Sequence, residues 1–186
     1  MDDETLQHSN IPAQPGPDPS RAPEQSLEAQ VGAELRRRDF KLVAAESCTG
    51  GLIGHRITNV PGSSDYYLGS VTAYAYEAKQ RLLGVSAATL AQHGAVSQEV
   101  VLEMARGARV ALTGDFSVDQ LVGVSVSGIA GPGGGLPHKP IGLVWIGLNA
   151  PGVERAWEYH FEGNRLEIKA QAAEQVLLNL LHYLRE

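Results

Sequence analysis

The sequence has a single cysteine, Cys48, among its 186 residues. One thiol cannot form an internal disulfide, and a chain without disulfides is typical of a reducing compartment. Long apolar runs are missing as well, because no stretch approaches the roughly 20 apolar residues that a membrane-spanning helix needs. The N-terminus also lacks the pattern of a signal peptide. These absences predict a cytoplasmic protein with no membrane partner.

Basic residues are in the minority: 15 lysines and arginines stand against 21 aspartates and glutamates, a formal net charge of −6. A protein that binds nucleic acid needs a basic face to neutralise phosphates. The only basic cluster, Arg36–Arg38, falls at the end of a predicted helix, where cations complement the helix dipole. The six histidines are scattered singly, without the spacings of metal ligands. We therefore expect no nucleic-acid partner, no metal and no other cofactor.

Proline is concentrated in the stretch 1–25, where five prolines lie among polar residues. Such a segment cannot bury enough apolar surface to offset its ordering entropy, which predicts a disordered tail. From residue 26 to 186, helical and strand-like patterns alternate over a length that suits one α/β domain. The predicted strands are Phe40–Ala45, Tyr67–Tyr74, Leu121–Val126, Ile141–Leu148 and Arg155–Phe161. Helices are predicted after Ser26, at Leu52–Thr58, from about Glu77 and Ala87, after Ser97, and at the C-terminus.

The first candidate site is the loop Glu46–Gly51, which follows a buried strand and opens a helix. Ser47 would be held on a rigid scaffold, and unpaired N–H groups at the helix start would face the same space. Such donors suit a phosphate or the oxyanion of an acyl-transfer intermediate. The alternative is an ordinary turn with a serine or threonine cap, which the pattern alone favours.

The second candidate is the glycine-rich stretch Gly128–Gly135, whose glycines let the backbone approach a ligand closely. It lacks the Lys-Ser/Thr ending of a P-loop, and its spacing differs from the GxGxxG dinucleotide pattern. A flexible loop is the alternative, although Pro132 and the pair Lys139-Pro140 stiffen the segment.

Tyr74 and Lys79, at a strand end and in the first turn of the next helix, form the third candidate. Together with Ser47 they would make a site that needs no histidine. In it the lysine acts as a base if burial lowers its pKa, and the tyrosine relays a proton. An exposed lysine is the commoner situation. Cys48 is a rival nucleophile, but a lone cysteine after a strand is commonly a small buried hydrophobe.

Six short motifs follow one another along the chain, and their residues and order form a recognisable pattern. They are Ala45–Gly51, Pro61–Ser64, Val71–Tyr74 leading to Glu77–Lys79, His93–Ser97, Ser127–Pro132 and Lys139–Gly142. From about Ser26 to the C-terminus, the chain resembles the CinA C-terminal domain family, the nicotinamide-nucleotide amidases of the PncC type. The resemblance implies a three-layer α/β/α single domain with a mixed sheet. It also implies a stand-alone form, because many members carry this domain behind a nucleotide pyrophosphatase domain.

The same resemblance implies an activity, the deamidation of nicotinamide mononucleotide to nicotinic acid mononucleotide and ammonia in pyridine-nucleotide salvage. Ser47 would then be the nucleophile, with Tyr74 and Lys79 as its acid–base partners. Backbone N–H groups near Gly50 and Gly51 would hold the oxyanion. The expected substrate-binding residues are Thr49, Gly50, Gly51, Ser127, Gly131, Gly133, Gly134, Lys139 and Arg165, with the phosphate on Arg165, Lys139 and the 131–134 backbone. The expected partners are this small-molecule nucleotide and further copies of the chain, as a homo-oligomer.

Three departures from the family pattern bear on the substrate pocket. Tyr74-Ala75-Tyr76 replaces a common Tyr-Ser-Asn, Asn164 replaces the aspartate before Arg165, and Leu136 replaces a small polar residue. None of them changes the proposed catalytic trio. Two other functions remain as alternatives: a non-catalytic nucleotide-binding module, and an interaction domain related to competence or DNA damage.

Overall fold

The computed structural model describes residues 26–186. The stretch 1–25, predicted to be a disordered tail, lies outside the described residues. The helices are α1 (Leu27–Arg37), α2 (Leu52–Thr58), α3 (Tyr76–Leu83), α4 (Ala87–His93), α5 (Gln98–Ala111) and α6 (Arg165–Arg185). The strands are β1 (Lys41–Glu46), β2 (Tyr67–Thr72), β3 (Leu121–Gly128), β4 (Leu143–Ala150) and β5 (Val153–His160). Short 3₁₀ turns lie at Ser63–Asp65 and Val118–Gln120.

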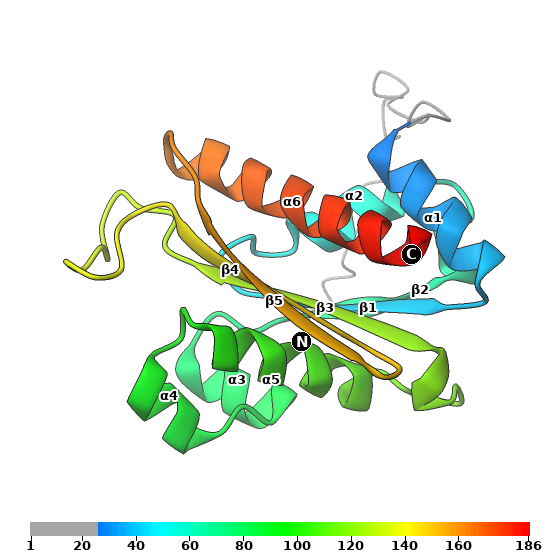
Figure 1. Ribbon diagram of the computed structural model, residues 1–186, viewed down its shortest axis with the longest axis horizontal. Coiled ribbons are helices and arrows are strands. Elements are labelled where there is room, and N and C mark those ends of the chain that lie inside the picture. Colours follow the sequence, from blue (N-terminus) through cyan, green and yellow to red (C-terminus); the bar gives the residue numbers. More distant parts are fainter. Residues whose placement is uncertain (1–25) are drawn as a thin grey trace, which may run out of the picture.

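The five strands form one mixed sheet in the order β2-β1-β3-β4-β5. Strand β1 runs parallel to both β2 and β3, whereas β4 and β5 add to the sheet as an antiparallel hairpin. Helices α1, α2 and α6 cover one face of the sheet, and α3, α4 and α5 cover the other (Figure 1). This arrangement confirms the predicted three-layer α/β/α fold with a mixed sheet.

Two apolar cores lie on the two faces of the sheet, and β1 contributes to both. Leu42 and Ala44 pack with α1, α2 and α6, whereas Val43 and Ala45 pack with α3, α4 and α5. Side chains alternate along a strand, so a strand covered on both faces is apolar throughout. This explains the unbroken apolar run that ends at the candidate loop.

Element boundaries differ from the sequence prediction mainly in the C-terminal hairpin. The predicted arm Ile141–Leu148 is observed two residues later, as β4, and the predicted arm Arg155–Phe161 begins two residues earlier and ends one residue earlier, as β5. A two-residue turn with Gly152 at φ +71 joins them, so pairing continues to Ala150 and Val153. The strand predicted as Tyr67–Tyr74 ends at Thr72. Tyr74 therefore follows the strand and lies beyond the edge of the sheet.

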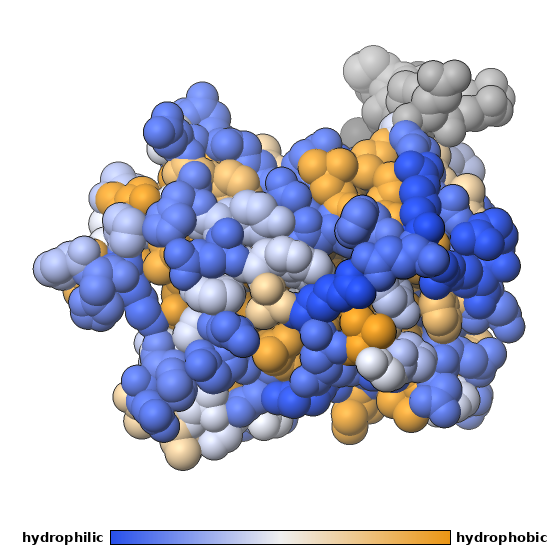
Figure 2. Space-filling model, in the orientation of Figure 1, coloured by the Kyte–Doolittle hydropathy of each residue, from blue (hydrophilic) through white to orange (hydrophobic). Residues whose placement is uncertain are grey.

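Hydrophilic residues dominate the face shown in Figure 2, and apolar residues appear there in separate patches. The helices therefore turn their polar sides outward, as the amphipathic patterns predict. None of the helices between residues 26 and 186 combines the length and hydropathy of a transmembrane span.

Candidate active site

The ends of three neighbouring strands meet at one edge of the sheet. Because β1, β2 and β3 are parallel, their carboxyl ends lie side by side, and ligands of α/β proteins bind outside this edge. The backbone N–H of Ser47 donates to the Val126 carbonyl at 3.1 Å, and that of Ala73 donates to the Glu46 carbonyl at 2.8 Å. These bonds bring Ser47, Tyr74 and Ser127 to the same edge, although they are far apart in sequence.

Lys79 and Ser47 form a buried pair at this edge. Lys79 lies in the first turns of α3, and its Nζ is 2.9 Å from Ser47 Oγ and 2.8 Å from the Ala73 carbonyl oxygen. A longer contact of 3.3 Å reaches the Tyr74 carbonyl oxygen. The lysine is only 1% exposed, and Ser47 is also buried. The expected exposed-lysine alternative is therefore wrong for Lys79.

Burial lowers the pKa of Lys79, because the charged ammonium loses its hydration inside the protein. Within residues 26–186 no carboxylate forms an ion pair with it. A neutral amine has two N–H bonds, which the two carbonyls can accept, and one lone pair, which can accept the Ser47 hydroxyl proton. The geometry therefore suits a lysine that acts as a base toward Ser47.

The lowered pKa of Lys79 also predicts how stability depends on pH. Between the folded-state pKa and the ordinary value of 10.5, the unfolded chain binds more protons than the folded one. The free energy of unfolding therefore rises with pH across this window. We expect it to rise relative to that of Lys79→Met, which has no titrating group here. Urea denaturation at a series of pH values checks this, and parallel curves for the two proteins would contradict it.

Cys48 follows the serine but lacks the chemistry of a nucleophile. Burial raises the pKa of its thiol to about 12, so the thiol stays protonated near neutral pH. The side chain packs in the core on the α6 face of the sheet. Cys48 thus behaves as the small buried hydrophobe that the sequence suggested.

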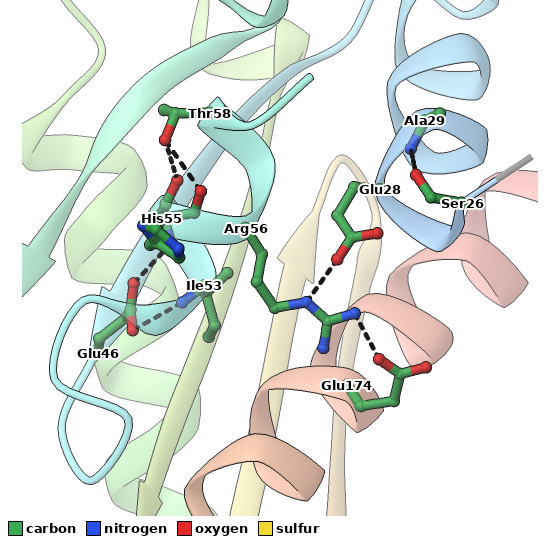
Figure 3. A network of polar contacts seen from close by, with 10 residues as sticks. Ser26, Glu28, Ala29, Glu46, Ile53, His55, Arg56, Thr58 and Glu174 are labelled. Carbon is green, nitrogen blue, oxygen red and sulfur yellow. Dashed lines mark hydrogen bonds and ion pairs between the residues drawn. The ribbon is translucent and has the colours of Figure 1, made fainter. Parts of the chain in front are cut away.

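The loop itself is organised by Glu46, whose side chain is fully buried. Its Oε2 accepts hydrogen bonds from Thr49 Oγ1 (2.7 Å), the Gly51 N–H (2.9 Å) and the Ile53 N–H (3.1 Å). Its Oε1 accepts from the Gly54 N–H at 2.9 Å. Figure 3 shows this carboxylate reaching the first turn of α2.

The N–H groups of Gly50 and Gly51, near which the oxyanion donors were predicted, are bonded within the loop. The Gly51 N–H donates to Glu46, and the Gly50 N–H donates to the Ser47 carbonyl at 3.1 Å. Both groups are already used inside the loop and are not available to a substrate. The two glycines instead supply backbone conformation, with φ values of +64 and +97 that other residues rarely adopt. The Thr49 hydroxyl is likewise bound to Glu46 rather than free for a ligand.

A cavity of about 830 Å³ opens beside the serine–lysine pair. The sequence-predicted residues on its wall are Ser47, Tyr74, Lys79, Ser127, Gly134 and Lys139. Ser127 is buried, and its hydroxyl donates to the Ala95 carbonyl at 2.7 Å. A Cβ at Gly133 would meet no atom within 4 Å, so this glycine lies in open space.

Lys139 lies on the cavity wall but is held by the backbone. Its Nζ donates to the carbonyls of His93 and Val96, which connect α4 to α5. An ammonium has three N–H donors, so these bonds leave one for a ligand. A phosphate-binding role for Lys139 stays a prediction, whereas its contact with the α4–α5 connection is observed.

Arg165 reaches two of the predicted site residues from the start of α6. Its Nη1 donates to the Gly131 carbonyl at 2.7 Å, and its Nη2 donates to the Tyr74 hydroxyl at 2.8 Å. Tyr74 is 60% exposed, and within residues 26–186 no hydrogen bond joins its hydroxyl to Ser47 or Lys79. The lysine therefore contacts the serine without a tyrosine relay, and Tyr74 lies at the cavity mouth.

Sequence reasoning missed residues that pairing across the sheet brings to the cavity. Ser127 on β3 is opposite Trp145 on β4, and Trp145 is opposite Glu158 on β5. Trp145 and Glu158 both line the cavity. The alternating pattern of the hairpin could have placed them on one face, but only its register aligns them with Ser127. Lys169, one turn after Arg165, was also missed; a Cβ at Gly50 would lie 3.8 Å from its Nζ.

Within the described part of the chain, no group of three histidine, cysteine, aspartate or glutamate side chains is arranged to hold a metal ion.

Comparison with known proteins identifies the family. Residues 24–184 match the model of the CinA C-terminal domain. The chain belongs to the CinA C-terminal domain family. A CinA-like protein of Salinibacter ruber is 51% identical over 80% of this chain and 35% of its own length. A putative competence-damage inducible protein of Moorella thermoacetica is 47% identical over 86% of this chain and 37% of its own length. The chain thus spans little more than a third of these curated relatives.

Solved structures of the family have the same fold. The competence damage-inducible protein A from Klebsiella pneumoniae is 34% identical, covers 86% of this chain and 96% of its own, and superposes with a TM-score of 0.79. A competence-damaged protein (CinA) superfamily protein from Escherichia coli is 29% identical, covers 88% of this chain and 93% of its own, and gives a TM-score of 0.75. Family membership and the fold therefore agree with the resemblance carried by the motifs.

Proposed function

We propose that this domain hydrolyses the carboxamide of nicotinamide mononucleotide to nicotinic acid mononucleotide and ammonia, with Ser47 as nucleophile and Lys79 as base. The observation that carries this proposal is the 2.9 Å contact between Lys79 Nζ and Ser47 Oγ in a buried setting. A buried lysine without a carboxylate partner has few structural reasons to exist, and perturbed groups of this kind concentrate at active sites. The cavity of about 830 Å³ is within the usual size range of small-ligand sites.

The proposed reaction runs through an acyl-enzyme. Neutral Lys79 takes the Ser47 hydroxyl proton as Oγ attacks the carboxamide carbon. The tetrahedral intermediate collapses as the carbon–nitrogen bond breaks, and Lys79 returns the proton to the leaving ammonia. Water then hydrolyses the Ser47 ester, again with Lys79 as base. The cationic pyridinium ring withdraws electrons from the carbonyl carbon and makes both attacks easier.

The cavity wall is compatible with a cationic ring. Trp145 lies between Ser127 and Glu158 in the row of paired strands, on the same wall as the serine–lysine pair. An indole face attracts a cation within about 6 Å of its centre. A pyridinium ring is therefore a chemically suitable ligand for a cavity that Trp145 lines.

Ammonia release tests the proposal. Purified protein is incubated with nicotinamide mononucleotide, and ammonia and nicotinic acid mononucleotide are measured together. Equal amounts of the two products from the wild type, and neither from Ser47→Ala, are expected. A wild-type protein that binds the nucleotide without releasing ammonia would contradict the proposal and favour a non-catalytic binding module.

Arg165 is expected to read the substrate phosphate. Its guanidinium donates to the Gly131 carbonyl and to the hydroxyl of Tyr74, a residue of the cavity wall, and an arginine suits a phosphate. Arg165→Ala should therefore lower kcat/KM for the nucleotide by about 10-fold or more, the size of a charge-assisted hydrogen bond. The loss should be small for nicotinamide riboside, which has no phosphate.

Tyr74→Phe is the control for this measurement, because it removes the hydroxyl that Arg165 contacts without removing the cation. Equal losses on both substrates in Arg165→Ala would show that the arginine positions Tyr74 instead. Phosphate binding would then pass to Lys139. The homo-oligomer expected from the family resemblance stays a prediction.

A further inference from the structure

The buried carboxylate of Glu46 has no part in the serine–lysine chemistry described above. It is 0% exposed, and within residues 26–186 no lysine, arginine or histidine pairs with it. Burying a charge is costly unless hydrogen bonds compensate it. Four donors converge on its two oxygens. An ionised carboxylate has only acceptor atoms, so it can accept all four hydrogen bonds. Such a complete set of bonds so close to the nucleophile indicates a role in positioning.

Glu46 fixes both ends of the loop that carries Ser47. At one end, its backbone carbonyl accepts from the Ala73 N–H and ties β1 to the end of β2. At the other end, its side chain holds the Ile53 and Gly54 N–H groups in the first turn of α2. Helix α2 is itself fixed, because Arg56 bridges Glu28 of α1 and Glu174 of α6 (Figure 3). The loop that carries Ser47 is thus fixed at both ends, at the end of β1 and at the start of α2.

The same bonds decide which backbone donors remain. The N–H groups of Gly51, Ile53 and Gly54 are bound to Glu46, so the start of α2 is closed to a substrate. In the described chain, the N–H groups of Cys48 and Thr49 donate to no oxygen, and their partner is the Cys48 sulfur, which is only a weak acceptor. They directly follow the nucleophile. An oxyanion formed on Ser47 would find its donors there.

We propose that Glu46 is a positioning residue that holds Ser47 against Lys79 and leaves the Cys48 and Thr49 N–H groups for the oxyanion. The inference rests on the proposed serine–lysine mechanism but not on the identity of the substrate. A shift of about 1 Å in a reacting group can cost about 100-fold in rate. The effect of losing Glu46 should therefore appear in the reactivity of Ser47 itself.

The test measures how fast Ser47 reacts with an alkyl fluorophosphonate, a probe that needs no nucleotide site. The Ser47 oxygen–phosphorus bond forms, the phosphorus–fluorine bond breaks, fluoride leaves, and the hydroxyl proton passes to Lys79. In Glu46→Gln the side-chain NH₂ group replaces one accepting oxygen, so a donor faces a donor and at least one of the four hydrogen bonds is lost. We expect labelling and kcat to fall about 100-fold, by the misplacement argument, while KM changes little.

The pH profile of labelling distinguishes an effect of Glu46 on the position of Ser47 from an effect on the proton of Lys79. If Glu46 acts by position, labelling of Glu46→Gln is slower at every pH but has the same midpoint as that of the wild type. A shifted midpoint would show that Glu46 acts on the proton of Lys79 and would overturn the proposal. Folded Glu46→Gln that labels at the wild-type rate would overturn it as well.

Thr49→Val decides the matter if Glu46→Gln does not fold, because it removes one of the four bonds with little change of shape. Its labelling should fall about 10-fold, the size of one hydrogen bond to a charged group. Thr49→Ser should recover most of that loss. Thr58→Val is the matched control: its hydroxyl caps the other end of α2, and its labelling should equal that of the wild type.

Three further outcomes separate this inference from the proposed function. Wild-type labelling at Ser47 without hydrolysis of nicotinamide mononucleotide would remove the proposed substrate and leave the role of Glu46 intact. Absence of labelling in the wild type would overturn both, because Ser47 would then not be activated. Equal labelling of Thr49→Val and the wild type would overturn the inference alone.

Discussion

Exchange of Lys79 for arginine is expected to lower kcat/KM for ammonia release by about 1,000-fold, within the range that a general base contributes. The positive charge is kept, but a guanidinium has a pKa above 12 and cannot accept the Ser47 proton. Its planar fork also does not fit a site that places one nitrogen between Ser47 Oγ and the Ala73 carbonyl. Steady-state kinetics with circular dichroism as a folding check measure this loss.

The pH profile of the wild type gives an independent view of Lys79. Burial lowers the pKa of Lys79, and only the neutral amine is a base. The value of kcat/KM should therefore rise with pH through this lowered pKa and level off above it. Lys41→Arg is the matched control and should keep wild-type kinetics. Lys41 lies far from the loop, and its Nζ donates to the Asp65 carbonyl. An active Lys79→Arg enzyme would contradict the serine–lysine mechanism and direct attention to His93.

Removal of the Ser47 hydroxyl is expected to have the largest effect of any single change. Ser47→Ala should lose at least about 1,000-fold in kcat, since removal of a nucleophile abolishes the covalent route. Cys48→Ala, the neighbouring change of similar size, should keep most of the activity. The raised pKa of the Cys48 thiol, about 12, leaves almost no thiolate near neutral pH. Kinetics of the two variants side by side compare the two candidate nucleophiles directly.

A covalent probe that modifies Cys48 in Ser47→Ala at the wild-type rate would reverse this assignment. The stability of both variants should stay close to that of the wild type, because neither substitution opens a large space. A cooperative thermal transition in each protein is the control that the loss in Ser47→Ala is chemical.

Much of the fold follows from local patterns in the sequence. A buried strand was predicted at Phe40–Ala45, and the corresponding β1 has cores on both sides. Ser26 and Ser97 cap the helices that they were expected to cap. Strand and helix periods are short-range properties, which is why they can be read without tertiary information. The hairpin was shifted because its tight turn at Gly152, rather than the apolar pattern, sets the register.

The candidate site was only partly predictable. The loop, the serine and the lysine stand out by position, but the 2.9 Å contact between them depends on where α3 begins relative to β1. Nothing local indicates that the Gly51 N–H donates to the Glu46 side chain or that the Gly50 N–H donates to the Ser47 carbonyl. Trp145 was missed for a similar reason, since the pairing of β3 with β4, not spacing along the chain, brings it next to Ser127.

Mapping of the covalent intermediate identifies the side chain that attacks the carboxamide. Wild-type protein turning over nicotinamide mononucleotide is quenched in acid, digested, and its peptides are weighed by mass spectrometry. We predict that the peptide containing Ser47 gains the mass of a nicotinic acid mononucleotide ester, and that Ser47→Ala shows no such gain. An adduct on Cys48, or steady ammonia release by Ser47→Ala at the wild-type rate, would contradict it.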